Sequence, residues 1–120
     1  MQTFESQYGS GVVGGILAHE WAHFIQYPIV QGTSRELQAD CVAGFTMQSL
    51  GASREDVARF ATATSNNADA IWTPYGHGTS QERWGAIDRG FRFGRPWRAD
   101  IPWDEQIRWL LEFACPPWQF

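Results

Sequence analysis

Apolar residues recur three and four positions apart in several stretches of this chain, the spacing that places side chains on one face of an α-helix. Five helices are predicted. The second begins at a cap, Thr33 or Ser34, and runs to about Leu50, and the others span 10–26, 54 to about 64, 80 to about 90 and 103–114. Pro28 and Gly51 mark the ends of the first two, because proline and glycine commonly follow the carboxyl end of a helix. The pattern predicts a mainly α fold.

Polar residues between the apolar stretches supply capping and turn signals. Ser53 with Asp56, and Thr79 with Glu82, have the three-residue spacing of a capping box at the start of a helix. The stretch 92–102 contains one glycine and two prolines and is predicted to be a connection. No stretch gives a convincing strand signal, so we expect little or no β-sheet.

The composition suits a single domain over 1–120, because 43% of the 120 residues are apolar and 15% are aromatic, enough to build a core. Nine basic and thirteen acidic residues give a net charge of -4, and none of the basic residues is lysine. Such a surface is a poor partner for nucleic acid or anionic membranes. No apolar stretch approaches the roughly 18 residues of a spanning helix, so we expect no membrane span in this chain.

Two cysteines, Cys41 and Cys115, are too few for the disulfide scaffold of a small secreted domain. A single bridge would tie the carboxyl-terminal tail to the second predicted helix, and closing so long a loop would stabilise the fold by about 4 kcal/mol. Two free thiols, one of them buried in a helix, are the alternative. The sequence leaves both open.

Residues 19–23 read HEWAH, an instance of HExxH in the middle of the first predicted helix. One helical turn separates His19 from His23, so both imidazoles project from one face and can share one ion. Zinc suits neutral imidazole ligands, and Glu20 is placed to take a proton from a metal-bound water as general base. The alternative is an ordinary helix with two surface histidines and a salt-bridging glutamate.

A catalytic zinc usually has three protein ligands, and the second predicted helix offers the third. Glu36 and Asp40 lie one turn apart on a common face, which an antiparallel return across a short loop would bring opposite the histidines. Glu36 would then bind the metal, and Asp40 would accept the other ring N–H of a ligand histidine, expected to be His19. Alternatively, Glu36 belongs to a capping box with Thr33, and Asp40 is a solvated charge.

The segment HEWAHFIQ, followed by ELQADCVAG and then HGTSQERWGAIDRGF, resembles the neutral zinc metallopeptidases of bacteria, a gluzincin-like group. The resemblance covers roughly 19–94, and the three blocks occur in the family's order. It implies a zincin-type fold with zinc at His19, His23 and Glu36, and with Glu20 as the catalytic acid and base.

Members of that family usually carry an upstream membrane anchor and a substrate-binding edge strand before the motif helix, and neither is evident in this sequence. Only 18 residues precede His19. We therefore expect this chain to be the carboxyl-terminal core of a longer protein, with any anchor in the missing amino-terminal part. The resemblance also implies a location in the cell envelope or outside the cell.

Several further residues are candidates for the site. His77 is a candidate catalytic residue that would stabilise an oxyanion, with Tyr75 as a rival; the alternative for His77 is a loop residue that orders the HGTS turn. Arg83 and Arg89 could orient a substrate carboxylate, although most arginines on helix surfaces have no such role. The seven tryptophans are expected mainly in packing, with cleft lining as the alternative.

These observations predict a zinc metalloendopeptidase that hydrolyses a peptide or protein substrate through a zinc-activated water, without a covalent enzyme intermediate. A zinc-stabilised binding or interaction module without hydrolytic activity is the alternative. A metal-free helical interaction domain is a third hypothesis. The sequence does not identify the substrate or the cleavage preference.

Overall fold

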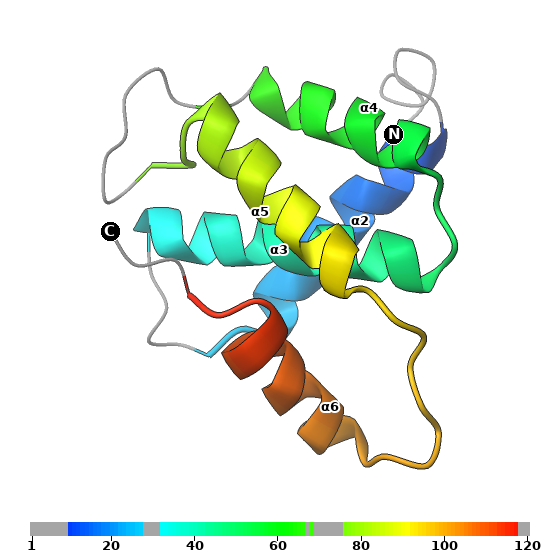
Figure 1. The fold of residues 1–120 in the computed structure, drawn as a ribbon. Helices are drawn as coiled ribbons and strands as arrows, with labels where there is room; N and C mark the ends of the chain where they lie inside the picture. Colours follow the sequence, from blue (N-terminus) through cyan, green and yellow to red (C-terminus); the bar gives the residue numbers. More distant parts are fainter. Residues whose placement is uncertain (1–9, 28–31, 67, 69–75, 118–120) are drawn as a thin grey trace.

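A computed structural model of the chain describes residues 10–27, 32–66, 68 and 76–117. Within this part of the chain the elements are α2 (Ser10–Ile25), α3 (Gly32–Ser49), α4 (Arg54–Ser65), α5 (Ser80–Phe93), α6 (Trp103–Trp109) and a short π-helix, η1 (Leu110–Ala114) (Figure 1). These ranges contain no β-strand, which confirms the prediction of a mainly α fold. None of the described helices has the length and apolar character required to cross a membrane.

The capping signals are confirmed at the starts of α4 and α5, but the predicted cap at Thr33 or Ser34 was wrong, because α3 begins at Gly32 and includes both residues. Ser53 Oγ accepts the backbone N–H of Asp56 at 3.1 Å at the start of α4. At the start of α5 the capping box is complete, because Thr79 Oγ1 accepts the N–H of Glu82 at 3.2 Å and the Glu82 carboxylate accepts the N–H of Thr79 at 2.9 Å. Gly51 follows α3 with a φ of 81°, a conformation that glycine adopts without steric cost.

Two helices differ from the prediction at their carboxyl ends. Helix α5 continues to Phe93, three residues past the predicted end at Gly90. The predicted helix over 103–114 is regular only as far as Trp109, after which the chain widens into η1. In that turn the N–H of Cys115 donates to Leu110 O at 2.7 Å, five residues back, instead of four.

Helix α3 is the central element of the fold, with α2 crossing behind it and α5 crossing diagonally in front of it in Figure 1. Its residues from Leu37 to Phe45 are buried without interruption, so no face of this segment meets solvent. A helix buried all round must satisfy its polar side chains internally. Gln38 and Asp40 are such residues, and both are fully buried.

Two glycines allow α3 and α5 to approach within backbone contact. A Cβ atom placed on Gly44 would lie 2.1 Å from Ile87 O, and one placed on Gly90 would lie 1.8 Å from Cys41 O. Any side chain at either position would push the helices apart. Gly90 is therefore a packing residue within α5 and does not end the helix.

The aromatic side chains attach α6 and the loop before it to the central helices. Trp97 and Trp103 stack with ring centroids 5.2 Å apart, and Trp21 of α2 contacts both edge-on. Phe45 of α3 contacts Trp97 and Trp109 in the same manner. These four tryptophans therefore have the packing role that was expected of most of the seven.

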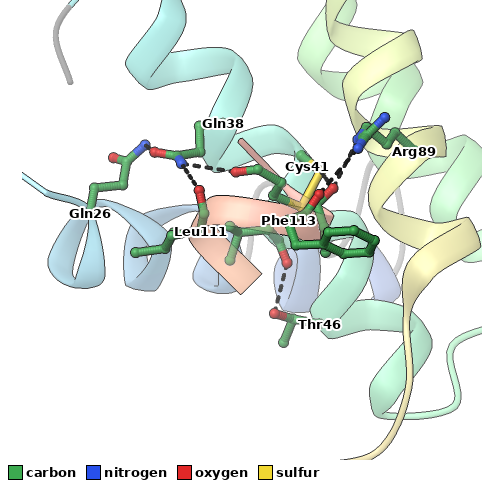
Figure 2. Close-up of a disulfide and its surroundings, with 10 residues drawn as sticks. Gln26, Gln38, Cys41, Thr46, Arg89, Leu111 and Phe113 are labelled. Carbon is green, nitrogen blue, oxygen red and sulfur yellow. Dashed lines mark hydrogen bonds between the residues drawn. A yellow bond between two sulfur atoms is a disulfide. The ribbon is translucent and has the colours of Figure 1, made fainter. Parts of the chain in front are cut away.

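A disulfide joins Cys41 on α3 to Cys115, which directly follows η1 (Figure 2). The Cα atoms of the two residues lie 5.6 Å apart, although 74 positions separate them in the sequence. Of the two alternatives that the sequence left open, the structure contains the bridge. It fixes the carboxyl-terminal turn against the middle of the central helix.

Candidate metal centre

His19 and His23 on α2 and Glu36 on α3 direct three potential ligand atoms at one point. His19 Nε2 lies 3.1 Å from His23 Nε2 and 3.1 Å from Glu36 Oε2, while His23 Nε2 lies 3.5 Å from the same carboxylate oxygen. The two imidazoles come from successive turns of α2, as the HExxH spacing predicts. Helix α3 supplies Glu36 as the third donor.

The spacing of these three atoms fits a small ion. Ligands at about 2.0–2.1 Å around a tetrahedral ion lie roughly 3.3 Å from one another. The three separations, 3.1, 3.1 and 3.5 Å, bracket that value. Two neutral imidazoles and one carboxylate are also a donor set that divalent metals accept. His19, His23 and Glu36 could therefore hold one metal ion.

A buried carboxylate orients the ring of His19. His19 Nδ1 donates to Asp40 Oδ1 at 2.9 Å, which leaves Nε2 facing His23 and Glu36. Asp40 is in turn held by Arg83 of α5, whose Nε donates to Oδ2 at 2.7 Å and whose Nη2 donates to Oδ1 at 3.0 Å. This is the arrangement predicted for Asp40, with a guanidinium added.

Gln26 orients the ring of His23 in the corresponding way. His23 Nδ1 donates to Gln26 Oε1 at 2.8 Å, so the Nε2 atom of this ring also faces the ligand cluster. The sequence analysis did not identify Gln26. Its position one helical turn after His23 was the available signal, because side chains three residues apart in a helix are neighbours.

The structure contradicts the non-functional alternative for Glu36 and Asp40. Helix α3 begins at Gly32, so Thr33 lies inside the helix, and its Oγ1 accepts the N–H of Gly76 at 3.0 Å. Asp40 has no exposed surface, so it is not a solvated charge. Both acidic residues instead face the histidines of α2.

The electrostatics of the cluster favour a protonated His19 beside an ionised Glu36 when no metal is bound. Burial lowers the pKa of His19, but the hydrogen bonds to Asp40 and Glu36 outweigh it and raise that pKa to about 9. Burial likewise raises the pKa of Glu36, but the hydrogen bonds from His19 and His23 outweigh it and hold that pKa far below the usual range. A divalent ion would replace this proton.

A cavity of about 280 Å³ lies over the cluster. His19, His23 and Glu36 line it together with Glu20 and His77. Glu20 and His77 are also exposed, so both can reach a molecule entering from solvent. The apolar part of the wall consists of Ile16, Phe60 and Ala63.

The remaining candidates are not all placed at the cluster. Arg83 lines the same cavity, but it is buried and bound to Asp40, so the description of it as a helix-surface residue was wrong, and the guanidinium has a structural partner. Arg89 donates from Nε to Ala114 O at 2.8 Å and from Nη2 to Phe113 O at 3.2 Å, away from the cluster. Tyr75 lies outside the described residues.

Comparison with known proteins adds no information about this site. The sequence matches no protein-family model, and neither the curated proteins nor the solved structures contain a match.

Proposed function

We propose that this chain is the core of a zinc-dependent metallopeptidase that hydrolyses peptide bonds, with a zincin-like pair of metal-binding helices. The observation that carries the proposal is the convergence of His19, His23 and Glu36 in the lining of a cavity that Glu20 also lines. Two histidines and a glutamate are a known ligand set of catalytic zinc. The resemblance to the neutral zinc metallopeptidases of bacteria supports the same function.

His19, His23 and Glu36 would hold the metal, and Asp40 and Gln26 would keep the two rings in the required orientation. When bound, zinc supplies Lewis-acid activation of a water molecule and of the substrate carbonyl. Every remaining role falls to the side chains that line the cavity.

Glu20 takes a proton from the attacking water and later delivers it to the leaving amine, since a carboxylate at the cavity surface can act in both directions. His77 donates a hydrogen bond to the oxygen that becomes negative when the carbonyl is attacked. The apolar wall formed by Ile16, Phe60 and Ala63 would accommodate an apolar substrate side chain.

The test compares wild type with Glu20→Gln on a broad peptide library, with cleavage followed by mass spectrometry and zinc content by elemental analysis. We expect the variant to bind zinc as wild type does and to lose at least about 100-fold in cleavage rate. Glu105→Gln, which changes an exposed glutamate on α6, is the matched control and should cleave normally.

Two results would count against the proposal. Wild-type protein with stoichiometric zinc that cleaves no peptide in the library would favour a zinc-stabilised binding module. Wild-type protein that takes up no zinc would favour a metal-free interaction domain.

A further inference from the structure

Two buried glutamines connect the candidate metal centre to the disulfide-bonded end of the chain. Gln26 Nε2 donates to Gln38 Oε1 at 3.0 Å and to Arg35 O at 2.7 Å. Gln38 Nε2 donates to Leu111 O at 3.2 Å and to Cys115 O at 2.9 Å. Figure 2 shows Gln26 and Gln38 side by side, with the Gln38 amide directed at the carboxyl-terminal turn.

Backbone carbonyls fix the direction of each bond in this relay, the hydrogen bonds that run from His23 through Gln26 and Gln38 to the carboxyl-terminal turn. They only accept hydrogen bonds, so the Gln38 amide must turn its NH₂ group to Leu111 and Cys115 and its oxygen to Gln26. Gln26 directs its NH₂ group at that oxygen and at the carbonyl of Arg35, and its own oxygen at His23.

An amide oxygen only accepts, so His23 Nδ1 must carry the ring proton that it shares with Gln26. The neutral His23 ring then has its lone pair on Nε2, the atom that faces His19 and Glu36. The relay therefore selects the tautomer that can bind a metal.

The carbonyls of Leu111 and Cys115 are available to Gln38 because of the residues that follow η1. The N–H of Cys115 bonds to Leu110 O, and the next two residues are Pro116 and Pro117, which have no N–H to offer. The carbonyls of η1 must therefore find side-chain donors, and Gln38 supplies one.

The disulfide holds these carbonyls in place. Cys115, whose carbonyl accepts from Gln38, is covalently attached to Cys41 one turn along the same helix from Gln38. Arg89 of α5 binds the neighbouring carbonyls of Phe113 and Ala114 on the other side of the turn (Figure 2). Without the bridge, the end of the chain could leave α3 and the acceptors of Gln38 would go with it.

We propose that Gln26 and Gln38 are positioning residues for the metal ligand His23, and that the Cys41–Cys115 disulfide sustains them, so that metal affinity depends on the oxidised bridge. The proposal rests on the proposed function only in requiring a metal at His19, His23 and Glu36. Reduction of the bridge would then weaken metal binding at a site that the sulfur atoms do not contact.

The test measures zinc affinity by competition with a chromophoric chelator. Gln38→Met keeps the side-chain volume but ends the relay, and we expect zinc to bind 10–100-fold more weakly, the usual effect of losing a group that orients a ligand. Gln106→Met is the matched control: Gln106 is also a buried glutamine and bonds Arg98 and Ile101, far along the chain from the cluster. Its zinc affinity should equal that of wild type.

The disulfide is tested by the double replacement Cys41→Ala with Cys115→Ala, which should weaken zinc binding in the same range. Adding Gln38→Met to that protein should cause little further loss, because both changes interrupt one relay and their effects should not add. Circular dichroism establishes which variants are folded. Gln26→Met, which removes the partner of His23 directly, serves if Gln38→Met does not fold, and it should show the same loss.

The outcomes separate this inference from the proposed function. Suppose that wild type binds zinc and cleaves peptides, and that the zinc affinities of Gln38→Met, Gln26→Met and the cysteine variant lie within twofold of wild type. This result would contradict the proposed role of the glutamines and the disulfide, and it would agree with the proposed peptidase function. Absence of zinc binding by wild type would overturn both. Tight zinc binding that depends on the two glutamines, without peptide cleavage, would support their positioning role and contradict the proposed peptidase function.

Discussion

Arg83 of α5 donates hydrogen bonds to both carboxylate oxygens of Asp40 on α3, at 2.7 and 3.0 Å. Asp40 Oδ1 also accepts the Nδ1 hydrogen of His19 on α2 at 2.9 Å. One fully buried carboxylate thus joins three helices and sets the orientation of a candidate metal ligand. Its charge is balanced inside the protein, because Arg83 is buried with it.

Removing Arg83 should therefore be costly. Arg83→Met removes the guanidinium that binds both oxygens of the buried Asp40 carboxylate, and we expect the free energy of unfolding to fall by about 3–5 kcal/mol in urea denaturation. Arg92→Met is the control, because Arg92 pairs with Asp88 at the surface of the same helix and should cost about 0.5 kcal/mol or less. Equal losses of unfolding free energy for the two variants would show that the buried Arg83–Asp40 pair stabilises the fold no more than the surface pair does.

The cluster of candidate metal ligands could be predicted from the sequence because it depends on local spacing. HExxH on one helix and two carboxylates four residues apart on the next need only a short antiparallel return to meet. Gln26 and Arg83 were harder to assign, because their roles depend on which buried groups face them across helices. Arg83 in particular reaches Asp40 across the contact between α3 and α5, where Gly44 and Gly90 let the two backbones approach closely.

The metal-free protein should lose stability as the pH rises from neutral. His19 has a pKa of about 9 in the folded chain and about 6.5 when unfolded, so folding favours its protonated form. The protonated His19 therefore contributes on the order of 3 kcal/mol to the free energy of unfolding. This contribution is fully present below about pH 6.5 and is lost as the pH rises through about 9. Urea unfolding in the presence of a chelator at several pH values measures it.

The zinc-loaded protein provides the comparison. A metal competes with the proton for His19 Nε2, so zinc binding should strengthen over the same pH range and stabilise the fold more at the alkaline end. Metal-free stability that is unchanged between pH 6.5 and 9 would contradict the hydrogen bonds assigned to His19.

The contact between α3 and α5 predicts opposite effects for two glycines of α5. Gly90→Ala places a methyl group into the backbone of α3, so we expect a loss of about 3 kcal/mol or more in thermal unfolding. A Cβ atom on Gly85 would meet no other atom within 4 Å, so Gly85→Ala should stabilise the helix by about 0.5–1 kcal/mol. A folded Gly90→Ala protein as stable as wild type would contradict the packing.

His77 should contribute to the rate of hydrolysis and not to metal binding. We expect His77→Ala to lower kcat by about 100-fold with zinc affinity and melting temperature unchanged, as for loss of one oxyanion donor. The alternative role, ordering of the loop before α5, would instead lower the melting temperature. Equal kcat for the variant and wild type would remove His77 from the mechanism.

Most of the fold followed from apolar periodicity and caps, since both act within a few residues of chain. Thr79 with Glu82 predicted the start of α5 correctly because a capping box is a local structure. The end of the last helix could not be predicted in the same way. Its π-turn accompanies a disulfide to Cys41 and hydrogen bonds from Gln38 and Arg89, all of which come from distant parts of the sequence.

The most direct test of the central claim is a crystal structure of zinc-supplied protein with an anomalous difference map at the zinc absorption edge. The account predicts one peak about 2.0–2.2 Å from His19 Nε2, His23 Nε2 and Glu36 Oε2, with a further coordination position open to the cavity. A map with no peak at this point, or with zinc bound elsewhere while the three side chains keep their places, would contradict it.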